Sequence, residues 1–109
     1  MSIEGAPFVV TDWREVPEAV HPGETGEARW RTVEAGNTRT RMVEYSPGYR
    51  ADHWCSRGHV ILVLEGELVT EIQDGPTHVL KPGMSYQVGD GLAPHRSHTS
   101  VGARLFIVD

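Results

Sequence analysis

The chain has 109 residues, enough for one hydrophobic core but too few for a second, so we expect a single domain over residues 1–109. Its net charge of -5 argues against a nucleic-acid surface, because phosphate binding requires clustered Lys and Arg, and the 10 present are scattered. No apolar run approaches the length that spans a bilayer, and the first residues lack a secretory pattern. We therefore expect a cytoplasmic protein with neither a nucleic-acid nor a membrane partner.

The first part of the chain, residues 1–29, is predicted to be an extended lead-in, because its prolines and glycines are closely spaced. Residues 30–109 are expected to form a body of strands. Within residues 38–45, alternate positions form two faces, one ending in Glu44 and the other containing Arg41. The sequence leaves open which of these faces points inward.

The rest of the chain consists of short runs rich in Val, Ile, Leu, Thr and Tyr between glycine and proline turns. This spacing is typical of an all-β sandwich or barrel. Asp74-Gly75 separates two such runs, residues 68–72 and 78–80, and predicts a hairpin in which Gly75 supplies the positive φ angle. No segment supports a long helix.

One strand, residues 60–64, is apolar at every position and must therefore be covered on both faces. Ile61 and Val63, in phase with His59, are predicted to line the barrel. The alternate residues face a second sheet or a partner subunit: Val60, Leu62 and Leu64. Because so short a chain has little material to cover that outer face, we expect a homodimer.

The most distinctive pattern is a set of metal-binding residue types, His53, Cys55 and His59 in one short stretch, followed by His95. His53 and Cys55 are two apart in a stretch with strand character, so we expect their side chains on the same face. The only cysteine cannot form an internal disulfide, so it is an inert thiol, a reactive thiol or a metal ligand. If they converge, the four predict a metal site. The alternative is that they are packing residues.

These residues resemble the two motifs of the cupin superfamily. The first motif, Gly, His-x-His, Glu and Gly, is matched over residues 48–66, where Cys replaces the second His and His replaces the Glu. The second motif is matched over residues 83–99, with His95 at its histidine position. More narrowly, Ala-Asp-His-Trp-Cys at residues 51–55 resembles the group called DHCW-motif cupin proteins, although the order here is Asp-His-Trp-Cys.

The resemblance implies a cupin-type jelly-roll barrel, a double-stranded β-helix, in a single domain. It also implies one divalent metal ion, whose ligands here would be His53, Cys55, His59 and His95. A thiolate combined with imidazoles favours Zn²⁺, and Fe²⁺, Ni²⁺ and Cu²⁺ remain alternatives. Glu44 and Tyr86 are candidates for a general acid or base if they face inward, and Asp52 is a candidate hydrogen-bond partner of the site.

The function expected from this site is binding a metal and acting on, or binding, a small organic molecule in the barrel pocket. An open zinc site would support hydrolysis, isomerisation or lyase chemistry, and an open iron site would support oxygen chemistry. The sequence does not determine the reaction, nor whether there is one. Two alternatives stay open: a non-catalytic module that binds or senses a metal or small ligand, and a metal-free structural cupin.

Overall fold

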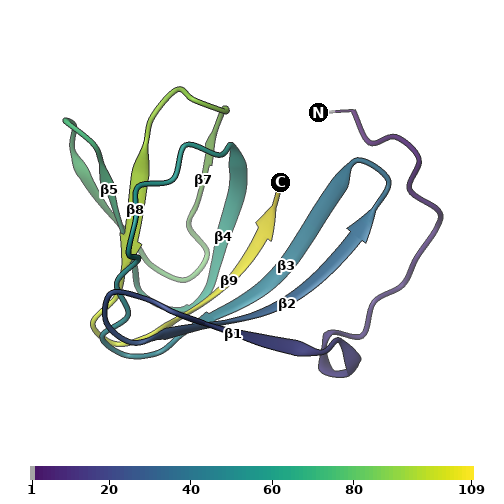
Figure 1. Ribbon diagram of the computed structural model, residues 1–109, viewed down its shortest axis with the longest axis horizontal. Helices are drawn as coiled ribbons and strands as arrows, with labels where there is room; N and C mark the ends of the chain where they lie inside the picture. Colours follow the sequence, from purple (N-terminus) through teal and green to yellow (C-terminus); the bar gives the residue numbers. More distant parts are fainter. Residues whose placement is uncertain (1) are drawn as a thin grey trace.

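The structure, a computed structural model, describes residues 2–109, which form nine β-strands and one short 3₁₀ helix, η1 (Trp13–Glu15). The strands are β1 (Glu18–Pro22), β2 (Glu27–Ala35), β3 (Thr38–Tyr45), β4 (His59–Gly66), β5 (Leu68–Ile72), β6 (Thr77–Leu80), β7 (Ser85–Val88), β8 (His95–His98) and β9 (Ala103–Val108). A larger sheet has the order β1-β2-β3-β9-β4-β7, and a smaller one has the order β6-β5-β8 (Figure 1).

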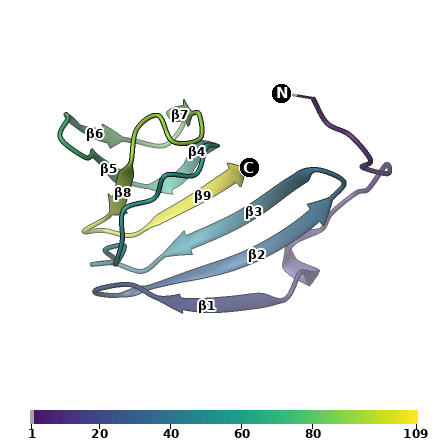
Figure 2. The ribbon, with the colours of Figure 1, turned by 45° about the horizontal axis from the view of Figure 1, so that its top comes forward.

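All neighbouring strands in both sheets are antiparallel. The small sheet lies over the β4 and β7 side of the large sheet, whereas β1 and β2 extend away from it (Figure 2). This arrangement of two packed antiparallel sheets confirms the predicted all-β jelly-roll class. Residues 2–109 contain no helix long and apolar enough to cross a bilayer.

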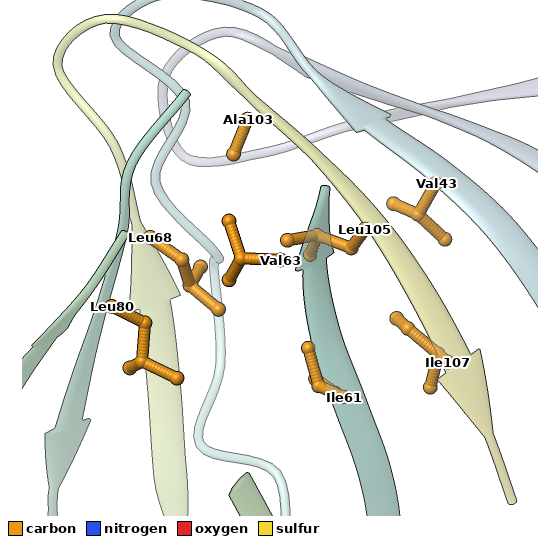
Figure 3. Packing of buried hydrophobic residues seen from close by; sticks show 8 residues of the cluster. All are labelled: Val43, Ile61, Val63, Leu68, Leu80, Ala103, Leu105 and Ile107. Carbon is orange, nitrogen blue, oxygen red and sulfur yellow. The ribbon is translucent and has the colours of Figure 1, made fainter. Parts of the chain in front are cut away.

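The hydrophobic core fills the space between the two sheets (Figure 3). Its fully buried members come from both layers and are Val43, Ile61, Val63, Leu68, Leu80, Ala103, Leu105 and Ile107. The predicted phase of β4 is confirmed, because Ile61 and Val63 are only 2% and 0% exposed. The alternate residues of β4 point away from the core and remain partly exposed.

On β3, the inward face is the one that contains Arg41. Val43 is 1% exposed and Arg41 is 6% exposed, whereas Glu44 is exposed to solvent. The guanidinium carbon of Arg41 lies 4.5 Å from the centre of the Trp30 ring, so an aromatic face partly shields the buried cation. The tertiary structure thus decides a question that alternation along the strand left open.

The lead-in predicted for residues 1–29 is wrong in part, because it contains β1 and the start of β2, which pair with each other. β1 has no apolar alternation to reveal it, since all of its residues are exposed at the edge of the sheet. Backbone pairing holds it there, together with an ion pair in which Arg29 Nη1 lies 2.8 Å from Glu18 Oε1.

The predicted hairpin is confirmed as β5 and β6, with a different turn chemistry. The positive φ angle, 57°, belongs to Asp74, not to Gly75. A left-handed conformation is tolerated by Asp better than by most side chains, because its short carboxylate bonds to nearby backbone.

Candidate metal centre

Two of the predicted ligands, His59 and His95, meet inside the barrel. His59 is the first residue of β4 and His95 the first residue of β8, so the two imidazoles come from opposite sheets. Their Nε2 atoms are 2.9 Å apart, and His95 is 3% exposed. Two imidazole nitrogens bound to one tetrahedral Zn²⁺ lie about 3.3 Å apart, given Zn–N bonds of about 2.0–2.1 Å. The pair therefore already has nearly the separation that a shared metal requires.

The ring of His95 is fixed by the backbone. Its Nδ1 atom donates a hydrogen bond to the Ala93 carbonyl at 2.7 Å, which leaves the lone pair on Nε2 in the neutral ring. A histidine that ligates a metal commonly donates its other N–H to such a carbonyl. Burial, followed by the neighbouring His95, lowers the pKa of His59 to about 4, so His59 is neutral at pH 7.

Tyr86 on β7 joins this pair. Its hydroxyl oxygen is 3.1 Å from His59 Nε2, and its ring packs edge-on against both imidazoles. Burial raises the pKa of Tyr86, the neighbouring Thr70 hydroxyl partly offsets that effect, and the charge of Cys55 adds to it. Tyr86 therefore carries its proton at pH 7 and lies inward, as its proposed role as an acid requires.

Cys55 lies across a short backbone bridge from His95. Cys55 N donates to His95 O at 2.7 Å and His95 N donates to Cys55 O at 2.9 Å, so both side chains leave the same face of this pair. The thiol is half-buried, and Arg57 N donates to its sulfur at 3.4 Å. The structure thus turns Cys55 toward the histidine pair, without bringing it into one cluster with them.

His53 does not reach this site. Its side chain is 74% exposed, and its Nδ1 atom lies 2.7 Å from the Asp52 carboxylate. The prediction that His53 and Cys55 share a strand face is wrong, because residues 51–58 form a loop, in which Cys55 makes a β-bridge to His95 and Ala51 N donates to Ser97 O of β8. Within residues 2–109, no three His, Cys, Asp or Glu side chains are close enough to hold one metal together. The predicted four-ligand set is therefore reduced to His59 and His95, with Cys55 nearby.

Glu44, a candidate general acid or base only if it faced inward, lies on the outward face of β3. It pairs in register with Arg29 and Arg104 on the outer face of the large sheet, opposite to the face that carries Val43 and the core. Because successive residues of a strand point to opposite faces, Glu44 cannot face the histidine pair while Val43 is buried. It is not a general acid or base for this site.

Asp109 is a site residue that the sequence did not reveal. One of its carboxylate oxygens is 3.8 Å from His59 Nδ1, a buried atom without a hydrogen-bond partner in the described chain. Arg39 and Arg41 hold the carboxylate at 2.8 Å and 2.9 Å. Burial would raise the pKa of Asp109, but these guanidinium groups lower it below its usual value. Nothing in the sequence around Asp109 indicates this contact, which arises from the pairing of β3 with β9.

A second missed residue is Thr70 on β5. It points into the barrel in phase with Leu68, is 2% exposed, and its hydroxyl has no hydrogen-bond partner within residues 2–109. A polar residue at an inward position between two apolar ones was a usable signal in this case, because buried hydroxyls ordinarily find partners. It lies in the wall of a cavity that also includes Tyr86 and His95.

No family model matches this sequence, and no curated protein matches it closely enough to be counted. Solved structures do match. A predicted oxalate decarboxylase from Thermotoga maritima superposes with a TM-score of 0.78 at 15% identity, over 92% of this chain and 96% of that one. A cupin-2 domain containing protein from Shewanella frigidimarina NCIMB 400 superposes with a TM-score of 0.61 at 19% identity, over 73% and 78% of the two chains. The chain has the cupin fold.

A third match, an Fe(II)-HppE structure with the alternative substrate (S)-1-HPP, superposes on this chain with a TM-score of 0.75 at 16% identity. It covers 94% of this chain and 60% of that protein. Identities this low establish a shared fold and no shared activity. The narrower resemblance to DHCW-motif cupins stays a prediction.

The donors at this site fit a borderline divalent cation. Two imidazoles from opposite sheets face each other, the ring of His95 is oriented by the Ala93 carbonyl, and the Cys55 side chain leaves the same face of the backbone bridge as His95. Nitrogen and sulfur donors of this kind suit Zn²⁺ first and Fe²⁺, Ni²⁺ or Cu²⁺ next. A third or fourth position would fall to Cys55 after a local movement, to solvent or to a bound molecule.

Proposed function

We propose that this cupin binds one divalent metal ion, Zn²⁺ first, through His59 and His95, and holds a small organic molecule in the adjoining barrel interior. The observation that carries the proposal is the 2.9 Å approach of the two Nε2 atoms, with His95 held by Ala93. Cys55 is the third donor in this proposal. His53, being exposed, has no part in it.

When bound, such a metal would supply Lewis-acid chemistry, polarising a carbonyl or lowering the pKa of a coordinated water. The chain's own groups set what happens around it. His95 is held in one orientation by the Ala93 carbonyl, and Tyr86 keeps a proton beside His59 Nε2. A proton at that oxygen can be donated to a bound molecule, so Tyr86 is the candidate general acid. The reaction itself follows from neither group.

The test is metal content, measured by inductively coupled plasma mass spectrometry on protein purified without an affinity tag. We expect near-stoichiometric metal in the wild type, less than a tenth of it in His59→Ala and His95→Ala, and an intermediate loss in Cys55→Ser. His53→Ala is the matched control and should retain the metal. A wild-type protein that stays metal-free after reloading with Zn²⁺ and with Fe²⁺ would overturn the proposal.

The second candidate is a metal-free cupin that binds a small ligand or serves a structural role. It is favoured by the direct contact between His59 and His95, which can be an ordinary hydrogen bond between the two imidazole rings. The two candidates differ under chelation. Dialysis against EDTA should lower the melting temperature of a metal-binding cupin and leave that of a metal-free one unchanged.

The oligomer in this proposal is a homodimer that forms through the outer face of β4 and β9. On that face, Val60, Leu62 and Leu64 are 37%, 36% and 37% exposed, and Phe106 pairs in register with Leu62. A continuous apolar surface of this kind is typical of an interface. Light scattering after size exclusion should give twice the chain mass for the wild type and the chain mass for Leu62→Glu. A monomeric wild type would refute the interface.

A cytoplasmic location completes the proposal, because a reducing compartment keeps a lone thiol such as Cys55 available as a ligand. Cell fractionation tests it directly. Recovery of the protein outside the cytoplasmic fraction would refute this part alone.

A further inference from the structure

A cavity of about 220 Å³ lies at the seam between the two sheets of the barrel. Its walls come from β5, β6, β7, the loop before β8 and the first residue of β8. β6 and β7 are edge strands of different sheets, so no hydrogen-bonded ladder closes the barrel between them (Figure 2). His78 and Gln87 are the exposed residues of the lining, and they mark the mouth. The cavity therefore has its own opening along the side of the barrel.

The interior of the cavity is mainly apolar. Ile72, Leu80 and Val88 form much of its surface, and none of the described residues that line it is an Asp, Glu, Lys or Arg. A charged ligand would lose its hydration there without gaining an ionic partner from the walls. An uncharged ligand has no such penalty. The chemistry of the walls thus selects against carboxylates and ammonium groups.

One polar group in the wall lacks a partner. Within residues 2–109, the hydroxyl of Thr70, which is only 2% exposed, has no hydrogen-bond partner of good geometry, although it lies close enough to the Tyr86 hydroxyl to lower the pKa of Tyr86. Buried hydroxyls in folded proteins are almost always satisfied, so an unmatched one in a cavity wall indicates a missing donor or acceptor. The same lining includes Tyr86 and His95, whose rings pack edge-on against each other and which connect the cavity to the candidate metal centre.

We propose that this cavity binds a small uncharged molecule with an apolar body and one hydroxyl or carbonyl group, which hydrogen-bonds to Thr70. A cavity of about 150 Å³ accommodates benzene, so this one has room for a ring with a small substituent. The proposal deepens and rests on the small-molecule part of the proposed function, because the ligand lies against His95. It does not depend on whether a metal is bound.

The test compares two probes of nearly equal shape, phenol and toluene, by NMR titration of metal-free protein kept in EDTA. Only phenol has a hydroxyl for Thr70, so the wild type should bind phenol about tenfold more tightly than toluene. Thr70→Val should abolish that preference while binding toluene as well as the wild type does. Thr77→Val, on the exposed part of β6, is the matched control and should retain the preference.

Three results would overturn the proposal: equal affinity for phenol and toluene in the wild type, tighter binding of benzoate than of phenol, or perturbed signals that lie outside the cavity. Leu80→Phe, which fills the cavity, should remove the binding of both probes, and circular dichroism confirms that the variant is folded. Metal analysis separates the two proposals. Protein that binds phenol but no metal supports the cavity and refutes the metal site. Protein that binds metal but not phenol supports the metal site and refutes the cavity.

Discussion

The sharpest test of the interior electrostatics is Asp109→Asn, which removes one charge and leaves the shape almost unchanged. The Asp109 side chain is 1% exposed and accepts hydrogen bonds from Arg39 and from Arg41, whose own side chain is 7% exposed. Without the carboxylate, the Arg41 cation stays buried without its anionic partner, and the Trp30 ring shields it only in part. Burial already lowers the pKa of Arg41, which shows that its charged form is poorly solvated.

The magnitude follows from this geometry. Removing one partner of a buried ion pair costs about 3–5 kcal/mol, because the other charge is left uncompensated. Arg39 is 20% exposed and can turn to water, so only Arg41 bears the full penalty. We therefore expect Asp109→Asn to lower the free energy of unfolding by about 3 kcal/mol. Adding Arg41→Met should recover more than half of that loss, because the buried charge is then gone.

The assay is urea denaturation of both single variants and the double variant, analysed as a double-mutant cycle. Glu65→Gln is the control, since its pair with Arg104 is 3.7 Å long and mostly exposed and should contribute less than about 0.5 kcal/mol. A loss below about 1 kcal/mol in Asp109→Asn, or no recovery in the double variant, would refute the argument that Arg41 needs this carboxylate.

Three further predictions concern stability. Leu105→Ala should cost about 3–4 kcal/mol in urea denaturation, because Leu105 is 0% exposed, whereas Leu64→Ala, at 37% exposure, should cost about 1 kcal/mol or less. The hydrogen bond from Arg96 lowers the pKa of Glu71. Ionised Glu71 therefore stabilises the fold at pH values above its pKa in the unfolded chain, about 4.3, and this stabilisation is lost as the pH falls through the folded-state pKa. In Glu71→Gln, the free energy of unfolding should fall less on acidification than it does in the wild type. The backbone of residue 74 has a φ angle of 57°, which Gly adopts freely and a β-branched side chain disfavours. By thermal melting, Asp74→Val should therefore lose about 1–2 kcal/mol of stability and Asp74→Gly should lose none.

The candidate site shows where reasoning from sequence was sufficient and where it failed. His59 was placed correctly because it is in phase with Ile61 and Val63, whose burial is set by local alternation. His53 was misplaced because the stretch before β4 is a loop, and alternation has no meaning outside a strand. The orientation of Glu44 could not be predicted from the sequence, because both faces of β3 contain polar residues.

The sequence by itself determined the all-β class, the hairpin of β5 and β6, and the inward face of β4, since each depends on neighbours within a few residues. Only the tertiary structure brought His95 to His59 and Asp109 to Arg41, because these partners lie on strands joined by packing and by pairing between distant segments. The same holds for the unpartnered Thr70 hydroxyl and its cavity. Alternation along a strand predicts the face to which a side chain points, whereas its contacts depend on how distant strands pack in the assembled barrel.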